Sequence, residues 1–188
     1  MKVNLRTEYE DDWPWLWHWR HELDNAEWKQ WDSPFLHDHI RRLSYEEFKQ
    51  AQVLNTRFGS IIEADGQRVG TVNRSELPPR GGGWWDIGIV IYDPTYRNQG
   101  IGTEAGRLWI DHTFNHTRAH VVTLSTWSGN EPMIKTGERL GLKECSRIPE
   151  ARSWKGLRYD VVQMSVLRAD WEKQRLDRTR TRYTRRAH

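Results

Sequence analysis

The stretch DIGIVIYDPTYRNQGIGTEA, residues 86–105, decides the fold. Its first half continues a run rich in β-branched residues and predicts a strand over residues 84–91. Its second half opens a helix from about Gly100 to Phe114, with Ile101, Ala105, Leu108 and Trp109 on one face. The segment RNQGIG, residues 97–102, joins the two elements. Glycines let a loop backbone approach a ligand closely, and a helix N-terminus presents unpaired N–H groups to anionic oxygens. With the charge of Arg97 beside it, this pattern is typical of a pyrophosphate cradle.

Residues 100–105 also fit the dinucleotide fingerprint G-x-G-x-x-A. That motif requires a carboxylate about 20 residues later, at the end of the next strand, to hold a ribose. The next predicted strand ends in Ser125-Thr126-Trp127 and carries none. The motif also follows a hairpin in mid-chain, where no βαβ unit begins. We therefore reject a Rossmann dinucleotide site.

The flanking sequence predicts alternating strands and helices. A short strand covers residues 2–6, and a helix follows Asp11-Asp12 with apolar residues at helical spacing up to Trp28. Ser44 opens a second helix as part of a capping box. Asp65-Gly66 joins two hairpin strands, residues 58–63 and 69–73. Further elements are a strand over 121–126, a helix from Asn130 to Leu140 closed by Gly141, and a strand over 159–167. This order predicts a mixed α/β layered fold.

Composition and charge limit the setting of the chain. Its 188 residues suit one domain, and no apolar run approaches the length of a membrane helix. Cys145 is the only cysteine, which excludes an intramolecular disulfide and a cysteine-based zinc site and favours a cytoplasmic location. The cations concentrate at the end of the chain, so we predict a single domain over residues 1–171 and a basic C-terminal tail over 172–188.

Residues 86–105 resemble motif A of the GCN5-related N-acetyltransferases (GNAT), whose signature R/Q-x-x-G-x-G/A follows a strand. The resemblance continues to Asn130, to Leu140-Gly141-Leu142, and to the closing strand at 159–167. That last segment is similar to the ribosomal-protein and polyamine acetyltransferase branch. The resemblance covers nearly the whole chain to about Trp171. It implies a central, mostly antiparallel sheet with a splayed parallel strand pair and helices on both faces.

The resemblance also implies an acetyl-CoA site, and no metal is expected because the sequence carries no metal fingerprint. The backbones of Ile89, Val90 and Ile91 would pair with the pantetheine amides, and Asn130 would contact the pantetheine end. The pyrophosphate would lie on the loop residues Arg97, Asn98, Gln99, Gly100, Ile101, Gly102 and Thr103. Each assignment has a purely structural alternative: core packing for the strand residues, a plain strand-to-helix turn for the loop, and a helix cap for Asn130.

The acid and base of the reaction are less defined. Many family members carry a tyrosine seven residues after the asparagine, poised to protonate the leaving thiolate, where this chain has Gly137. Asp86 stands where family members often carry a strand-end glutamate, and it is our candidate for a general base that acts through water. It is equally well explained as a solvated strand-end carboxylate. Glu63 on the hairpin is a weaker candidate.

The N-terminal helices interleave tryptophans with carboxylates. In the family this region forms the acceptor pocket, and such a mixture favours a cationic amine. Core packing with a homodimer contact explains it equally well. His18, His21 and Glu22, with His37 and His39 nearby, could outline a metal site, but without a metal fingerprint a polar helix face is the better interpretation.

Two hypotheses follow from the sequence. The first is an acetyl-CoA-dependent N-acetyltransferase that transfers acetyl directly to a primary amine, such as a protein N-terminus, a polyamine or another small amine. The second, motivated by Gly137, is a non-catalytic acyl-CoA-binding module whose basic tail contacts RNA or a protein partner. The tail could bind RNA or the ribosome through non-specific electrostatics, although a solvated terminus is commoner. No membrane partner is expected.

Overall fold

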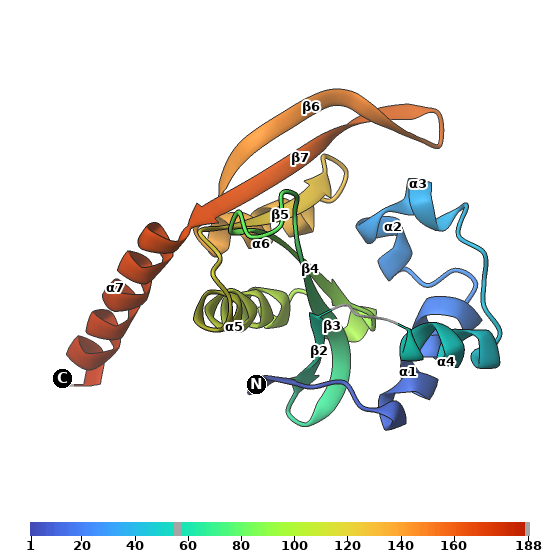
Figure 1. Cartoon of the computed structure of the whole chain (residues 1–188), viewed down its shortest axis with the longest axis horizontal. Coiled ribbons are helices and arrows are strands. Elements are labelled where there is room, and N and C mark those ends of the chain that lie inside the picture. The colour runs from blue at the N-terminus through green and yellow to red at the C-terminus, as the bar shows by residue number, and fades with distance from the viewer. Residues whose placement is uncertain (55–57, 187–188) are drawn as a thin grey trace.

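A seven-stranded sheet forms the centre of the protein in the computed structural model, which describes residues 1–54 and 58–186 (Figure 1). The strands follow the order β1-β2-β3-β4-β5-β7-β6 across the sheet. Their bounds are β1 Val3–Arg6, β2 Phe58–Ala64, β3 Gln67–Glu76, β4 Trp84–Ile91, β5 Val121–Trp127, β6 Lys143–Trp154 and β7 Leu157–Leu167. Every neighbouring pair is antiparallel except β4 and β5. The predicted mixed α/β fold with one parallel pair is confirmed.

The parallel pair separates along its length. Pairing begins at Trp84 opposite Val121 and ends at Ile87 opposite Leu124. Strand β4 continues to Ile91 and stays paired with β3 on its other side. The second half of β4 therefore has one open edge, in the middle of the sheet.

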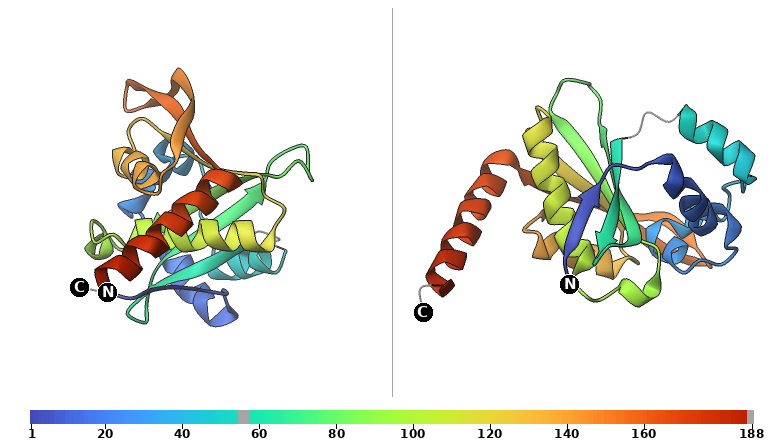
Figure 2. Two further views of the ribbon diagram at one scale, coloured as in Figure 1. Left: turned by 90° about the vertical axis from the view of Figure 1, so that its left-hand side faces the viewer. Right: turned by 90° about the horizontal axis from the view of Figure 1, so that it is seen from below.

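Helices cover both faces of the sheet, as expected (Figures 1 and 2). On one face, α5 (Ile101–His116) and α6 (Glu131–Arg139) pack with the sheet around the largest apolar cluster, which includes Trp109, Ile110 and Val162. The other face carries α1 (Trp13–Trp17), α2 (Trp28–Asp32), α3 (Pro34–His37) and α4 (Tyr45–Val53). A second apolar cluster around Leu16, Phe48 and Tyr92 fills the space beneath them. Each face of the sheet thus has its own core.

Local sequence signals explain several turns. Asp65 and Gly66 both have positive φ, 47° and 82°, as a two-residue type I′ hairpin requires. Ser44 caps α4 by accepting from the Glu47 N–H at 3.3 Å, while the Ser44 N–H donates to Glu47 Oε2 at 2.8 Å. Gly141 ends α6 with a φ of 80°. The hairpin, the capping box and the C-terminal glycine are confirmed.

The continuous N-terminal helix expected to reach Trp28 is wrong. A 3₁₀ turn, η1 (Glu10–Asp12), leads into α1, and a π-helical segment, η2 (His18–Glu22), follows it. Leu23 is extended, with a ψ of 117°, and Trp28 begins the separate helix α2. Asp24 and Asn25 lie in the intervening turn. Side chains of this type compete for the backbone hydrogen bonds of a helix, which explains the break.

The predicted boundary at residue 172 falls inside a helix, α7 (Arg168–Arg186), which projects from the end of β7 (Figure 2). Its start is anchored, because Trp171 is only 1% exposed and its Nε1 donates to Asp111 Oδ1 at 2.7 Å. Arg178 lies over the Trp171 ring, 4.6 Å from its centroid. Residues 187 and 188 of the predicted tail lie outside the described residues. Within the described part of the chain, no helix is long and apolar enough to cross a membrane.

Candidate active site

A cleft of about 800 Å³ opens where β4 and β5 separate. Its walls come from α2, the end of β4, the loop that starts α5, and α6. Every residue predicted to bind the cofactor lines this cleft except Gln99, whose Nε2 donates to Thr95 O at 2.6 Å. The lining residues predicted from sequence are Ile89, Val90, Ile91, Arg97, Asn98, Gly100, Ile101, Gly102, Thr103 and Asn130.

The open edge of β4 forms the middle of the cleft. Backbone groups of alternate strand residues point to opposite neighbours. The Tyr92 N–H donates to Val69 O of β3, and the Val90 carbonyl lies against Gly70 of the same strand. Ile89 and Ile91 therefore turn their backbone groups to the side that β5 has left. This gap can pair with an extended chain of amides, and Ile89 and Ile91 are better placed for that than Val90.

The glycine loop leaves space for a ligand at the start of α5. Gly100 caps the helix with a φ of 78°, a conformation that side chains other than glycine rarely adopt. A Cβ added at Gly100 or at Gly102 would meet no protein atom within 4 Å. The helical ladder starts with the Glu104 N–H, which donates to Gly100 O at 3.0 Å. The N–H groups of residues 101–103 come before it, at the positive end of a 16-residue helix. This arrangement suits a pyrophosphate.

Arg97 lies in the cleft wall with its guanidinium already engaged. Nη1 donates to Glu27 Oε1 at 2.8 Å, and Nη2 donates to Tyr92 O at 3.2 Å. Nε and Nη2 also approach Ile91 O, both at 3.4 Å. The side chain thus fastens the loop to the end of β4 and to the N-terminus of α2. This ion pair with Glu27 was not foreseen from the sequence, since 70 residues separate the two.

Asn130 serves as a helix cap and also faces the cleft. Its Oδ1 accepts from the Met133 N–H at 3.1 Å, which caps α6. The residue is 5% exposed and lines the cleft. Among the described residues, Nδ2 donates no hydrogen bond, so it can serve a carbonyl in the cleft. The capping and binding interpretations of Asn130 are therefore compatible.

Asp86 lies on β4 just before the strands part, and it does not line the cleft. Its Oδ1 accepts from the Thr123 hydroxyl at 2.7 Å and from the Ser125 hydroxyl at 3.0 Å. Among the described residues, Oδ2 accepts no hydrogen bond. Burial raises the pKa of Asp86, and the two hydroxyl donors partly offset that rise. Asp86 lies three residues before Ile89, roughly 10 Å along the strand, so it could receive a proton only through water.

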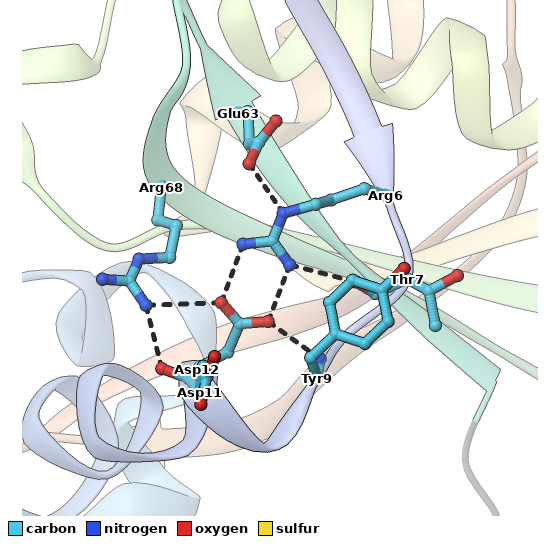
Figure 3. Close-up of polar contacts among 7 residues, drawn as sticks. All are labelled: Arg6, Thr7, Tyr9, Asp11, Asp12, Glu63 and Arg68. Carbon is cyan, nitrogen blue, oxygen red and sulfur yellow. Dashed lines mark hydrogen bonds and ion pairs between the residues drawn. The ribbon is translucent and has the colours of Figure 1, made fainter.

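Glu63, the weaker base candidate, takes part in a structural ion network instead (Figure 3). Arg6 donates from Nε to Glu63 Oε1 at 2.6 Å and from two nitrogens to the Asp12 carboxylate, both at 2.7 Å. Arg68 also donates to Asp12, at 3.3 Å, and Asp12 is buried. These bonds hold the Asp12 pKa below its usual value against the effect of burial. The network joins β1, β2, β3 and the first helical turn, away from the cleft residues.

Gly137, where the family tyrosine is expected, faces the core. It is buried in α6, and an added Cβ would lie 2.4 Å from Met164 Sδ. The thiolate therefore receives no acid from this position. Cys145 is exposed on β6 and donates to Gln163 O at 3.4 Å; it does not line the cleft.

Several carboxylates of the tryptophan-rich segment have a basic partner, an arginine for three of them and a histidine for two. Asp12 pairs with Arg6, Asp24 with Arg42, and Glu27 with Arg97. Glu22 and Asp32 pair with His18 and His37. Across residues 1–54 and 58–186, no group of three His, Cys, Asp or Glu side chains is arranged to hold a metal ion.

The tryptophans form an aromatic wall around Tyr92. Trp15 and Trp28 meet this ring edge-on, with centroids 5.4 and 5.1 Å away, and Trp19 stacks on it at 6.2 Å. Trp28 and Trp31 also line the cleft. Sequence reasoning flagged the tryptophans but could not say which of them reach the site. It missed Lys135 and Arg139, whose i, i+4 spacing on α6 places both along the cleft.

The family model described as an acetyltransferase (GNAT) domain matches residues 2–143. The chain belongs to the GNAT acetyltransferase family. Solved structures agree with the fold: spermidine N-acetyltransferase from Vibrio cholerae, in complex with CoA and spermine, superposes with a TM-score of 0.74 at 18% identity, over 90% of this chain and 97% of that one. Ribosomal-protein-alanine N-acetyltransferase from Brucella melitensis gives 0.65 at 18%, over 89% and 99%. Aminoglycoside acetyltransferase AAC(6')-Ib with coenzyme A and kanamycin gives 0.71 at 17%, over 93% and 99%. No curated protein sequence matches the chain.

In this GNAT protein, the residues present fit acetyl-CoA as co-substrate. Three features of the cleft carry that fit: the open backbone at Ile89, the space left at Gly100 and Gly102, and the free amide nitrogen of Asn130. None of them depends on a metal.

Proposed function

We propose that this chain transfers the acetyl group of acetyl-CoA directly to a primary amine. The observation that carries the proposal is the open edge of β4, which lies in one cleft with the glycine loop and Asn130. A pantetheine arm laid along Ile89 and Ile91 would extend the sheet by hydrogen bonding, and its pyrophosphate would lie at the start of α5.

The remaining steps are removal of a proton from the amine and departure of the thiolate, and both take place near the gap between β4 and β5. The acceptor amine must lose a proton as it bonds to the acetyl carbon, and Asp86 would take that proton through water bound at its free Oδ2. Burial raises the Asp86 pKa, which makes the carboxylate a better base than an exposed aspartate. The thiolate leaves without help from position 137, which a thiol pKa near ~8.5 allows. The acetyl group passes directly to the amine without an acyl-enzyme on cysteine, because Cys145 lies outside the cleft and offers no carrier.

The buried position of Gly137 supports the second candidate, a non-catalytic acyl-CoA-binding module. The two candidates differ in turnover and agree on CoA binding. Thiol release from acetyl-CoA, measured over a panel of peptides, polyamines and aminoglycosides, separates them. Release that depends on an amine, with the acetylated amine identified by mass spectrometry, supports the enzyme. Tight CoA binding without turnover on any amine favours the module.

A further inference from the structure

A second pocket, of about 490 Å³, lies on the other side of α2 from the cofactor cleft. Trp28 and Trp31 of that helix line the cleft, whereas Lys29 and Gln30 line the second pocket. Its far wall is Trp154 and Lys155, at the tip of the β6–β7 hairpin. The hairpin reaches over α3 (Figure 1), and α3 contacts β6.

The lining of this pocket is basic. It contains four cations, Arg20, Lys29, Arg42 and Lys155, against two carboxylates, Asp24 and Asp38. Asp24 is already paired with Arg42. Among the described residues, Arg20, Lys29 and Lys155 take part in no ion pair. Lys29 and Lys155 are therefore without a compensating carboxylate among the described residues, whereas the Glu8 carboxylate partly offsets the charge of Arg20. Asp38 is the one carboxylate of the pocket without a cation partner in the described part of the chain.

Those three cations are held in place by neutral groups. Arg20 Nε donates to the Tyr92 hydroxyl at 2.8 Å, which leaves both terminal nitrogens without a bond in the described structure. Lys29 Nζ donates to Leu23 O at 2.9 Å. Lys155 Nζ lies 4.5 Å from the centroid of the Trp154 ring. Arg20 and Lys29 are also partly withdrawn from water, whereas Lys155 is exposed at the hairpin tip. A cation that is fixed and partly buried binds an anion more strongly than a mobile surface lysine does.

Burial and the neighbouring cations change the pKa values of two groups in the pocket. Burial lowers the pKa of His21, and the charges of Arg20, Lys29 and Arg42 lower it further. Burial also lowers the pKa of Lys29. The opposite side of His21 faces Leu43, whose N–H donates to Nδ1 at 3.3 Å. His37, the other histidine of the lining, is bonded to Asp32 at 2.8 Å. An anion in the pocket would reverse the effect of the cations on His21.

We infer that this basic pocket binds an anionic group, a carboxylate or a phosphate, carried by the acceptor amine. The inference rests on the proposed function, because it assumes that an acceptor enters beside the cofactor cleft. Only α2 separates the two cavities, and the Asp32–His37 bond joins their walls. This selectivity is opposite to that expected from the carboxylates in the sequence, of which Asp12, Asp24 and Glu27 are paired with arginines.

The first test compares acceptors that differ only at the far end. Primary amines of four, six and eight carbons would each end in carboxylate, phosphate, carboxamide or a second amine. At the best length, kcat/KM for one of the anionic acceptors should exceed that for the carboxamide and the diamine by about tenfold. The anionic acceptor with the higher kcat/KM shows whether the pocket prefers a carboxylate or a phosphate. The double variant Lys29→Gln with Lys155→Gln should reduce the ratio to below about threefold, whereas Lys2→Gln, an exposed lysine elsewhere, should keep it. A preference for the diamine, or a ratio unaffected by the double variant, would overturn the inference.

The second test does not require turnover. The His21 ring is titrated by NMR with and without glutarate, and with and without orthophosphate, and His21→Gln assigns its signal. At least one anion should raise the His21 pKa by about half a unit or more, without moving exposed His120. If neither anion changes the His21 pKa and acetylation does not depend on an anionic group in the acceptor, the inferred anion site is wrong, whereas the proposed function still stands. A raised His21 pKa without turnover on any amine overturns the proposed function and the acceptor assignment, and leaves an anion-binding pocket.

Discussion

Arg97 Nη1 donates to Glu27 Oε1 at 2.8 Å and so joins the glycine loop to the residue that precedes α2. The same guanidinium holds the carbonyls of Ile91 and Tyr92. One side chain thus connects three walls of the cleft: the glycine loop, the open strand and the N-terminal helices. Helix α2 forms one wall of each cavity and is also held by its buried Trp28 and by the hydrogen bond from Trp127 Nε1 to Trp31 O at 2.9 Å.

The Arg97–Glu27 pair should weaken CoA binding, because Glu27 places a negative charge beside the proposed pyrophosphate site. The variant Glu27→Gln frees Arg97 for the phosphates, so the Kd for CoA should fall about twofold to fivefold, most clearly at low salt. Calorimetry measures this. The matched control Glu22→Gln, which breaks the pair with His18 outside the cleft, should leave the Kd unchanged. Weaker binding by Glu27→Gln would show that the pair holds the site together instead.

Asp86 has two separable effects, one on rate and one on stability. Asp86→Asn keeps an acceptor for Thr123 and Ser125 but removes the proposed base. Turnover should fall by about tenfold to a hundredfold near pH 7, and the deficit should shrink at higher pH as more of the amine is deprotonated in solution. The pH profile of kcat/KM checks this. A deficit that is constant with pH would exclude Asp86 as the base.

The stability effect follows from the raised pKa of Asp86. A carboxyl whose folded pKa exceeds its unfolded value of 3.8 favours the folded state while protonated. That contribution is present below the unfolded pKa and is lost as the pH rises through the folded pKa. Asp86→Asn should therefore raise the Tm at pH 7, with a gain that shrinks as the pH falls toward 4. Thermal unfolding across this range is the measurement, and a lower Tm at pH 7 would contradict the account of this site.

Gly137 is required by packing. Because its Cβ would lie 2.4 Å from Met164 Sδ, Gly137→Ala should destabilise the protein by about 1–3 kcal/mol in urea unfolding. Gly137→Tyr should fold worse and should not increase turnover. The matched control is Gly102→Ala in α5, where a Cβ meets no protein atom and stability should be kept. Faster turnover in Gly137→Tyr would mean that this position does face the thiolate.

The predicted domain boundary near residue 172 can be tested at α7. Trp171 is buried against Asp111, so Trp171→Ala should cost about 3–5 kcal/mol of stability. Deleting residues 179–188 keeps Trp171 and Arg178 and should leave the Tm nearly unchanged. The same deletion tests the RNA or ribosome contact predicted for the tail, because it should flatten the salt dependence of RNA binding. A large loss of stability on deletion would mean that the distal part of α7 is packed.

The sequence predicted those parts of the fold that depend on interactions among a few consecutive residues. The Asp65-Gly66 turn and the Gly100 cap require positive φ, and a capping box needs only its own four residues. Strand β4 and helix α5 followed from a change in apolar period. Ten of the eleven residues that the sequence predicted to bind the cofactor line one cleft.

The remaining features depend on contacts between distant segments. The helix break at Leu23–Asn25 combines a local turn with packing of Leu23 against the apolar cluster that contains Tyr92. Apolar spacing along the sequence does not reveal this packing. The pairing of Glu27 with Arg97 joins two segments 70 residues apart, and no pattern in the N-terminal sequence indicates it. The basic pocket combines Arg20 and Lys29 with Lys155 from the hairpin tip, more than a hundred residues later. No pattern in the sequence places these side chains together.

Calorimetric titration of CoA into the wild-type protein and Gly102→Val tests the central claim most directly. Gly102 lines the cleft, and an added Cβ meets no protein atom, so valine at this position would occupy ligand space while the fold is kept. We predict that the wild-type protein binds one CoA, and that Gly102→Val loses at least about tenfold in affinity with an unchanged Tm. No binding by the wild-type protein, or equal binding by Gly102→Val, would contradict the assignment of this cleft to acetyl-CoA.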